Sequence, residues 1–201
     1  MPLAAEERGS AHSRLVFPLF RLAVSAAQSA CQASTVLISR HDVIPRRDLD
    51  SLLVKVYAYV EVPYTTTDRK VNHHELGLVF AILAMGTLHN LELEATDPLA
   101  TEYMDLAKRS LTRGSFLQHN TIAALQTLHV IAHVHLETEG GKNGDSAWPL
   151  WGLSMRLVLA MGLHRDGHRW GLSPEVVQER RSVYWQCQST DVMQANCFSR
   201  P

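Results

Sequence analysis

Two histidines near the middle of the chain, His129 and His133, have the spacing best suited to chemistry. Side chains four residues apart lie on one side of a helix, and two imidazoles placed in this way are a common part of zinc sites. The zinc-protease pattern HExxH is absent, because Val130 and not glutamate follows His129. We interpret the pair as part of an ordinary polar stripe with Gln126 and Glu137, and keep a helical metalloprotein or hydrolase using His129 and His133 as the alternative.

Other short patterns of catalysis are missing from the sequence. It contains no GxSxG nucleophile elbow, no GxxxxGK[ST] phosphate loop and no GxGxxG dinucleotide loop. The remaining histidine groups, His73-His74-Glu75 and His164 with His168, are too sparse to form a metal site by themselves. We therefore predict that the chain is not an enzyme and that it has no catalytic, metal or cofactor-binding residues.

The three cysteines, Cys31, Cys187 and Cys197, lie far apart and form no CxxC pair. An odd and widely spaced set argues against a disulfide framework or a zinc site, and it suits a reducing compartment. We expect these cysteines to be small buried apolar side chains.

Composition limits the possible partners. The 201 residues include 46% hydrophobic and 19% charged residues, which suits one sizeable globular domain. Lys plus Arg total 19 against 20 for Asp plus Glu, whereas a domain that holds DNA by itself usually has a basic excess. The longest apolar run, 76–88, is shorter than the roughly 20 residues of a membrane span, and Pro18 and Arg21 interrupt the apolar N-terminal stretch, so we expect neither a membrane segment nor a signal peptide.

Apolar residues recur with helical spacing along most of the chain, and no stretch alternates with the period of a strand. The sequence predicts an all-α fold of about seven helices, with residues 1–44 as a partly helical N-terminal extension and residues 45–201 as the main domain. The predicted helices span 48–60, 74–92, 119–137 and 147–161, with two further helices beginning at Asp97-Pro98 and at Ser173-Pro174-Glu175.

Two of these helices are expected to be central. The helix over 74–92 is apolar around most of its circumference, and the helix over 147–161, with Ser146 as its predicted N-cap, should be buried nearly all round. Four tryptophans could line an apolar ligand pocket, but we favour the simpler interpretation that they belong to the core. They are Trp148, Trp151, Trp170 and Trp185.

The last quarter of the chain, 148–201, resembles a known family. Its buried helix ends in a charged turn, and a helix with an acidic start, an arginine cluster and an aromatic pair follows. The residues that carry the resemblance are Gly162-Leu163-His164-Arg165-Asp166, Trp170-Gly171-Leu172, Glu179-Arg180-Arg181, Tyr184-Trp185, Asp191 and Ser199-Arg200-Pro201. This set resembles the middle homology region of fungal Zn2Cys6 zinc-cluster transcription factors, also described as the xylanolytic-activator-type regulatory domain, and weaker similarity extends over 45–201.

The sequence departs from the family pattern in several places. Ser199 replaces the glycine of the terminal tripeptide, Ser182 stands where an arginine is usual, and the connection between Tyr64 and His74 is shorter. The six closely spaced cysteines of the zinc cluster are absent, and the chain stops at Pro201, where family members continue with further helices. We expect a domain that is incomplete at its C-terminus, either a fragment or a reduced paralogue.

The resemblance implies a regulatory role in the nucleus. It implies a domain that controls DNA-templated transcription through intramolecular and protein contacts, with co-regulators or the factor's own activation segment as partners and a homodimer in the full-length factor. DNA and zinc would be bound only by a module that this sequence does not include. We expect Arg165 and Asp166 to connect their loop to the last helix through Glu179, Arg180 or Arg181, as a regulatory corner. The third interpretation is a helical interaction module with no transcriptional role.

Overall fold

The computed structural model describes residues 44–61, 71–90, 93, 98–138 and 144–200. Over these residues the chain forms six α-helices and one short 3-10 helix, and no strand, which confirms the all-α class and a helix number close to the predicted one. The elements are α2 (Arg46–Glu61), α3 (His73–Leu88), α4 (Leu99–Arg113), α5 (Ile122–Thr138), α6 (Ala147–Ala160), η1 (Gly167–Trp170) and α7 (Pro174–Cys197).

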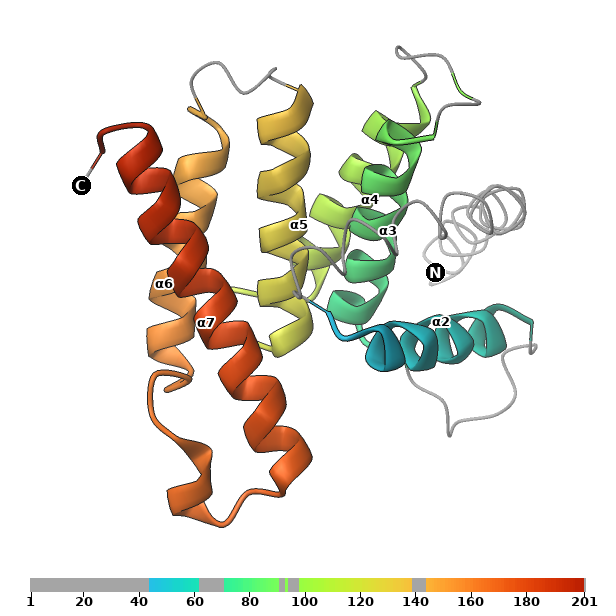
Figure 1. The fold of residues 1–201 in the computed structure, drawn as a ribbon. Coiled ribbons are helices and arrows are strands. Elements are labelled where there is room, and N and C mark those ends of the chain that lie inside the picture. The colour runs from blue at the N-terminus through green and yellow to red at the C-terminus, as the bar shows by residue number, and fades with distance from the viewer. Residues whose placement is uncertain (1–43, 62–70, 91–92, 94–97, 139–143, 201) are drawn as a thin grey trace, which may run out of the picture.

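Helices α3 to α7 lie side by side, and α2 lies across the lower end of α3, on the side of the molecule away from α6 (Figure 1). Along this row, α3 packs mainly against α4 and α5, α5 packs against α6, and α6 packs against α7. The predicted N-terminal extension over 1–44 lies almost wholly outside the described residues.

Helix α3 forms the centre of the core, as its sequence predicts. A capping box fixes its start, because Asn72 accepts a hydrogen bond from the His74 amide (3.0 Å) and Glu75 accepts one from the Asn72 amide (2.9 Å). His74 is buried in its first turn, and from Gly77 to Thr87 its residues are buried without interruption. A Cβ atom on Gly77 would lie 3.3 Å from the Ser110 Cβ, so glycine at this position lets α3 and α4 approach closely. The helix ends at Leu88, earlier than predicted.

Helix α6 departs from the expectation of burial nearly all round. Its buried residues are Ala147, Trp151, Ser154, Leu157 and Val158. They form a single face, toward α5 and α7, whereas Leu159 on the opposite side is 51% exposed. Ser146 occupies the N-cap position as predicted, but it adopts a helical conformation and its side chain makes no capping hydrogen bond.

Helix α7 begins as predicted. Ser173 is its N-cap and accepts a hydrogen bond from the Val176 amide at 3.5 Å, and Pro174 occupies the first turn. The helix then runs for 24 residues along the outside of the molecule, and only Val177, Val183, Cys187, Thr190 and Gln194 are buried. No helix in the described part of the chain is long and apolar enough to cross a membrane.

Candidate functional site

The turn after α6 positions the family motif. The Gly162 amide donates to the Leu159 carbonyl (3.0 Å), and the Leu163 amide donates to the Val158 carbonyl (3.0 Å). This paired arrangement ends many helices and needs a left-handed residue, which Gly162 provides with φ +66°. Leu163 then inserts into the core, so that the chain leaves the helix in a fixed direction.

The α6–α7 corner, which we define as residues 162–181, is held together by two arginines of α7. Arg180 donates to the carbonyls of Met161 and Gly162 at 3.3 and 3.2 Å. These carbonyls lie at the C-terminal end of α6, where the helix dipole favours a cation. One residue later, Arg181 forms an ion pair with Asp166, with 2.6 Å between the guanidinium nitrogen and the carboxylate oxygen. Two partly buried hydrogen bonds from Arg180 and one exposed ion pair of Arg181 therefore connect α7 to the end of α6 and the turn that follows it.

Asp166 has two tasks in this corner. Besides pairing with Arg181, its carboxylate caps η1 by accepting a hydrogen bond from the His168 amide at 3.2 Å. The hydrogen bond from Arg181 and then that from the His168 amide lower the pKa of Asp166. Both donors stabilise the ionised carboxylate, so the corner depends on the charge of Asp166.

The structure brings only some of the predicted site residues together. His164 and Arg165 are exposed in the turn, and Arg165 makes no ion pair with any described residue. Glu179 belongs to a different environment, because burial and then the nearby Asp48 of α2 raise its pKa. Asp191 lies further along α7, where burial raises its pKa.

The terminal motif lies at the other end of α7. Arg200 forms an ion pair with Asp145 and stands over the Trp148 ring, with its guanidinium carbon 5.7 Å from the ring centroid. Pro201 lies outside the described residues. Ser199 has φ +51°, a left-handed conformation that explains why glycine suits this position in the family pattern.

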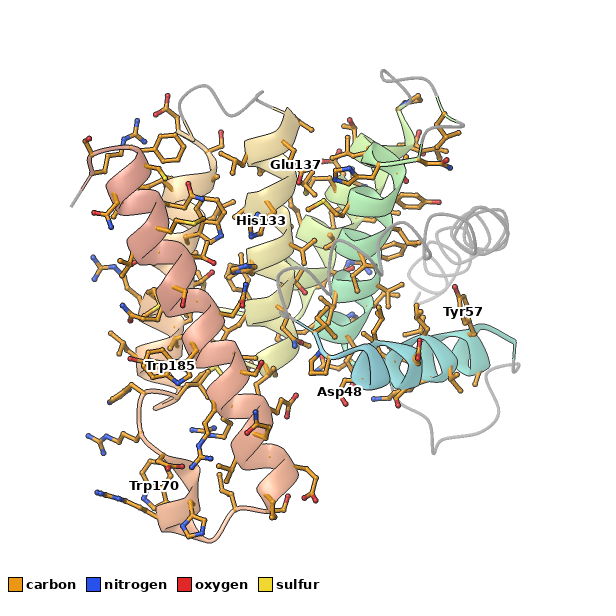
Figure 2. The ribbon with its side chains drawn as sticks, in the orientation of Figure 1. Asp48, Tyr57, His133, Glu137, Trp170 and Trp185 are labelled. Carbon is orange, nitrogen blue, oxygen red and sulfur yellow. The ribbon has the colours of Figure 1, made fainter. Side chains whose placement is uncertain are left out.

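Two tryptophans contradict the expectation that all four belong to the core. Trp151 is 1% exposed, but Trp170 and Trp185 are 53% and 62% exposed. Trp185 lies on α7 (Figure 2), one turn after Arg181. Its ring is edge-on to that of Tyr184, with 5.1 Å between centroids. A cysteine expectation is also wrong, since Cys197 is exposed while Cys187 is buried, with burial raising its pKa to about 12.

The histidine pair is a buried feature and not a solvated polar stripe. His129 and His133 are 0% and 8% exposed, and Gln126 is buried as well. The two Nε2 atoms lie 3.1 Å apart, so one ring donates a hydrogen bond and the other accepts it. Trp151 of α6 covers His133 edge-on, with 5.2 Å between centroids. Among the described residues no third histidine, cysteine or carboxylate joins them as a potential metal ligand.

Sequence reasoning missed the contacts between distant segments. Asp145 gave no signal as the partner of Arg200, and nothing in the sequence placed Asp48 beside Glu179. Such pairs become visible only when the helices are packed. By contrast, only η1, a short turn and the first two turns of α7 separate Asp166 from Arg181, 15 residues later, so their proximity could be predicted.

The described residues form an all-α domain with a charged corner between α6 and α7, and the comparisons give its family. A family model described as "Fungal specific transcription factor domain" matches residues 39–201. The chain belongs to this family. No solved structure matches it.

Curated relatives carry the same role in their names. The chain is 29% identical over 121 residues to the pyriculol/pyriculariol biosynthesis cluster transcription factor 1 of Pyricularia oryzae, covering 57% of this chain and 16% of that protein. It is 31% identical over 118 residues to the aurofusarin cluster transcription factor aurR2 of Gibberella zeae, covering 54% and 17%. It is 26% identical over 168 residues to the activatory protein CHA4 of Saccharomyces cerevisiae, covering 74% and 25%. The matched region is thus a quarter of the relatives' length or less.

Proposed function

We propose that this chain regulates transcription in the nucleus through protein contacts, with DNA and zinc bound by a separate module of the factor, and that it has no catalytic activity. Family membership and the names of the relatives support this proposal. The balanced charge of 19 basic against 20 acidic residues also favours protein contacts over direct binding to phosphates.

The α6–α7 corner carries the proposal. Arg180 anchors α7 to the end of α6, whereas the Asp166–Arg181 pair is exposed on both sides, with 45% and 48% of the side chains accessible. Exposed ion pairs contribute little to folding because water screens them. The corner can therefore exchange this pair for contacts with another segment while the core stays folded. We propose that Arg165, Asp166 and Arg181 form the surface that makes this exchange.

A tethered reporter tests the proposed function. Residues 1–201 are fused to a heterologous DNA-binding module and an activation segment, and reporter output is compared with that of the same fusion lacking the domain. We expect the domain to change the output at equal protein level. Unchanged output would contradict the transcriptional role and favour an interaction module without one.

A control variant distinguishes an effect of the folded domain on the reporter from an effect of the added length of chain. The same fusion carrying Trp151→Ala, which removes a fully buried side chain and destabilises the folded domain, should show a smaller effect at equal protein level. An effect that survives this substitution unchanged would show that the folded domain is not responsible, and the proposal would fail.

A further inference from the structure

A groove separates the start of α2 from the start of α7. It has a volume of about 970 Å³, and its walls come from α2 and the first turn of α3 on one side and from the first turns of α7 on the other. Figure 2 shows Asp48 at the end of α2 nearer α7, and Tyr57 toward the far end. The groove is separate from the Asp166–Arg181 pair, since neither of those residues lines it.

Apolar side chains and carboxylates line this groove together. Its residues are Pro45, Asp48, Ser51, Leu52, Lys55, Glu75, Pro174, Glu175, Val176, Gln178, Glu179 and Ser182. They include four carboxylates and one ammonium group, and the ammonium of Lys55 is already bound by both oxygens of Glu75 at 2.6 and 2.7 Å. Among the described lining residues, carboxylates therefore outnumber cations. Val176, which is 40% exposed, provides an apolar surface beside it.

Two like charges face one another across the groove. Asp48 and Glu179 come from helices far apart in the sequence, and the charge of Asp48 adds to burial in raising the pKa of Glu179. Neither carboxylate takes part in an ion pair between described side chains, which do not include those of Arg46 and Arg47. This arrangement is unfavourable in the free domain, and a positive group placed between the two carboxylates would relieve it.

The lining selects the kind of occupant. Carboxylates repel the phosphates of nucleic acids, so the groove does not suit DNA or RNA. A free small cation would leave the apolar surface of Leu52 and Val176 uncovered, whereas a peptide that carries both apolar and basic side chains matches both parts of the lining. The volume is within the range of sites that bind small ligands and short segments.

We propose that the groove between α2 and α7 docks a short basic, amphipathic segment of a partner protein. Its Lys or Arg side chain lies between Asp48 and Glu179, and its apolar side chains cover Leu52 and Val176. The inference rests on the proposed function in one respect, that the domain acts through protein contacts, and it specifies the chemistry of one such contact.

A peptide-binding experiment tests the groove with the full 201-residue chain. Two fluorescein-labelled peptides of equal length, RLLRRLLR and ELLEELLE, are titrated with the protein, and fluorescence anisotropy is measured at low and high salt. We expect the arginine peptide to bind at least about tenfold more tightly than the glutamate peptide, and added salt to reduce the difference because it screens charge.

Matched variants locate the binding site. The double variant Asp48→Asn/Glu179→Gln should weaken binding of the arginine peptide by about tenfold, because it removes both facing charges. Glu102→Gln/Asp105→Asn is the control, since it removes two exposed carboxylates from α4, outside the groove, and changes the net charge equally. Val176→Ser should also weaken binding, without a change in charge.

Equal weakening by the two double variants, or equal affinity for the two peptides, would overturn the inference. The outcome is independent of the reporter assay. If the groove variants bind the arginine peptide like the wild type while the reporter responds to the domain, the docking site is excluded and the proposed function stands. Specific peptide binding without any reporter response would support the groove and contradict the transcriptional role.

Discussion

Helices α3 and α7 show how differently two helices of this domain are used. Twelve of the 16 residues of α3 are buried, whereas only five of the 24 residues of α7 are. α3 contacts α4 and α5 and forms the centre of the core, while α7 packs on α6 at one end of the row (Figure 1). The difference indicates that α3 and its neighbours provide the stability of the fold, and that α7 provides surface for contacts. Substitutions in the two regions should therefore have different effects.

The largest expected effect on stability is at Trp151, and Trp185 is the comparison. Trp151→Ala should lower the free energy of unfolding by about 3–5 kcal/mol, because it opens a cavity against α5. Trp185→Ala removes a side chain that is 62% exposed and should change stability by less than about 0.5 kcal/mol. Urea unfolding followed by circular dichroism measures both. Equal losses would contradict the division between core and contact surface.

The next effect is at Arg180. Arg180→Met should destabilise the domain by about 1–3 kcal/mol, because the carbonyls of Met161 and Gly162 lose a charged donor at a helix end. Arg169→Met is a control, since Arg169 is an exposed arginine of the same corner. Thermal unfolding of the two variants should show a lower midpoint for Arg180→Met alone. A similar fall in the midpoint of both variants would mean that stability depends on total charge and not on the hydrogen bonds from Arg180 to the end of α6.

A gain in stability is expected at the end of α7. Ser199 has φ +51°, which costs a residue with a Cβ atom about 1–2 kcal/mol and costs glycine little. Allowing for the greater freedom of glycine in the unfolded chain, Ser199→Gly should stabilise the domain by about 0.5–1 kcal/mol. Ser189→Gly, an exposed position inside α7, should instead destabilise it. Chemical unfolding measures both changes in the free energy of unfolding and shows whether they have opposite signs.

The smallest effect is the pH dependence of the Asp166–Arg181 pair. The pKa of Asp166 is lowered in the folded domain, so its contribution to stability is present above the unfolded pKa of about 4 and is lost as the pH falls through the lower folded pKa. The wild type should therefore lose slightly more stability than Asp166→Asn between pH 5 and pH 3. Parallel unfolding curves for the two proteins over this range would show that the pair does not affect folding.

The sequence predicts the helices well because their signals are local. Apolar spacing indicates α3, and Ser173-Pro174 sets the start of α7 within one residue. Burial was harder to predict, because it depends on how many neighbours a helix has. α6 is apolar on most sides, yet it lies between only two main neighbours, α5 and α7, and leaves Leu159 exposed.

The contrast between local signals and packing also explains how much of each candidate site could be predicted. The corner is formed within 20 residues, so the proximity of Asp166 to the arginines follows from the chain connectivity. The groove depends on how the start of α2 is placed relative to the start of α7, and the charges of Asp48 and Glu179 carry no sequence signal of their own. The spacing of His129 and His133 indicates that they share one side of a helix, but it does not indicate that Trp151 covers them, so their burial does not follow from the sequence.

Arg165 provides the most direct test of the account, because it belongs to the family motif, is exposed and makes no ion pair with a described residue. The measurement is reporter output from the tethered domain, with the thermal unfolding midpoint determined on the same variant. The account predicts that Arg165→Ala changes reporter output while the midpoint stays within experimental error of the wild type. A variant that loses stability and output in parallel would show that the corner is structural, and it would contradict a regulatory surface at this end of α7.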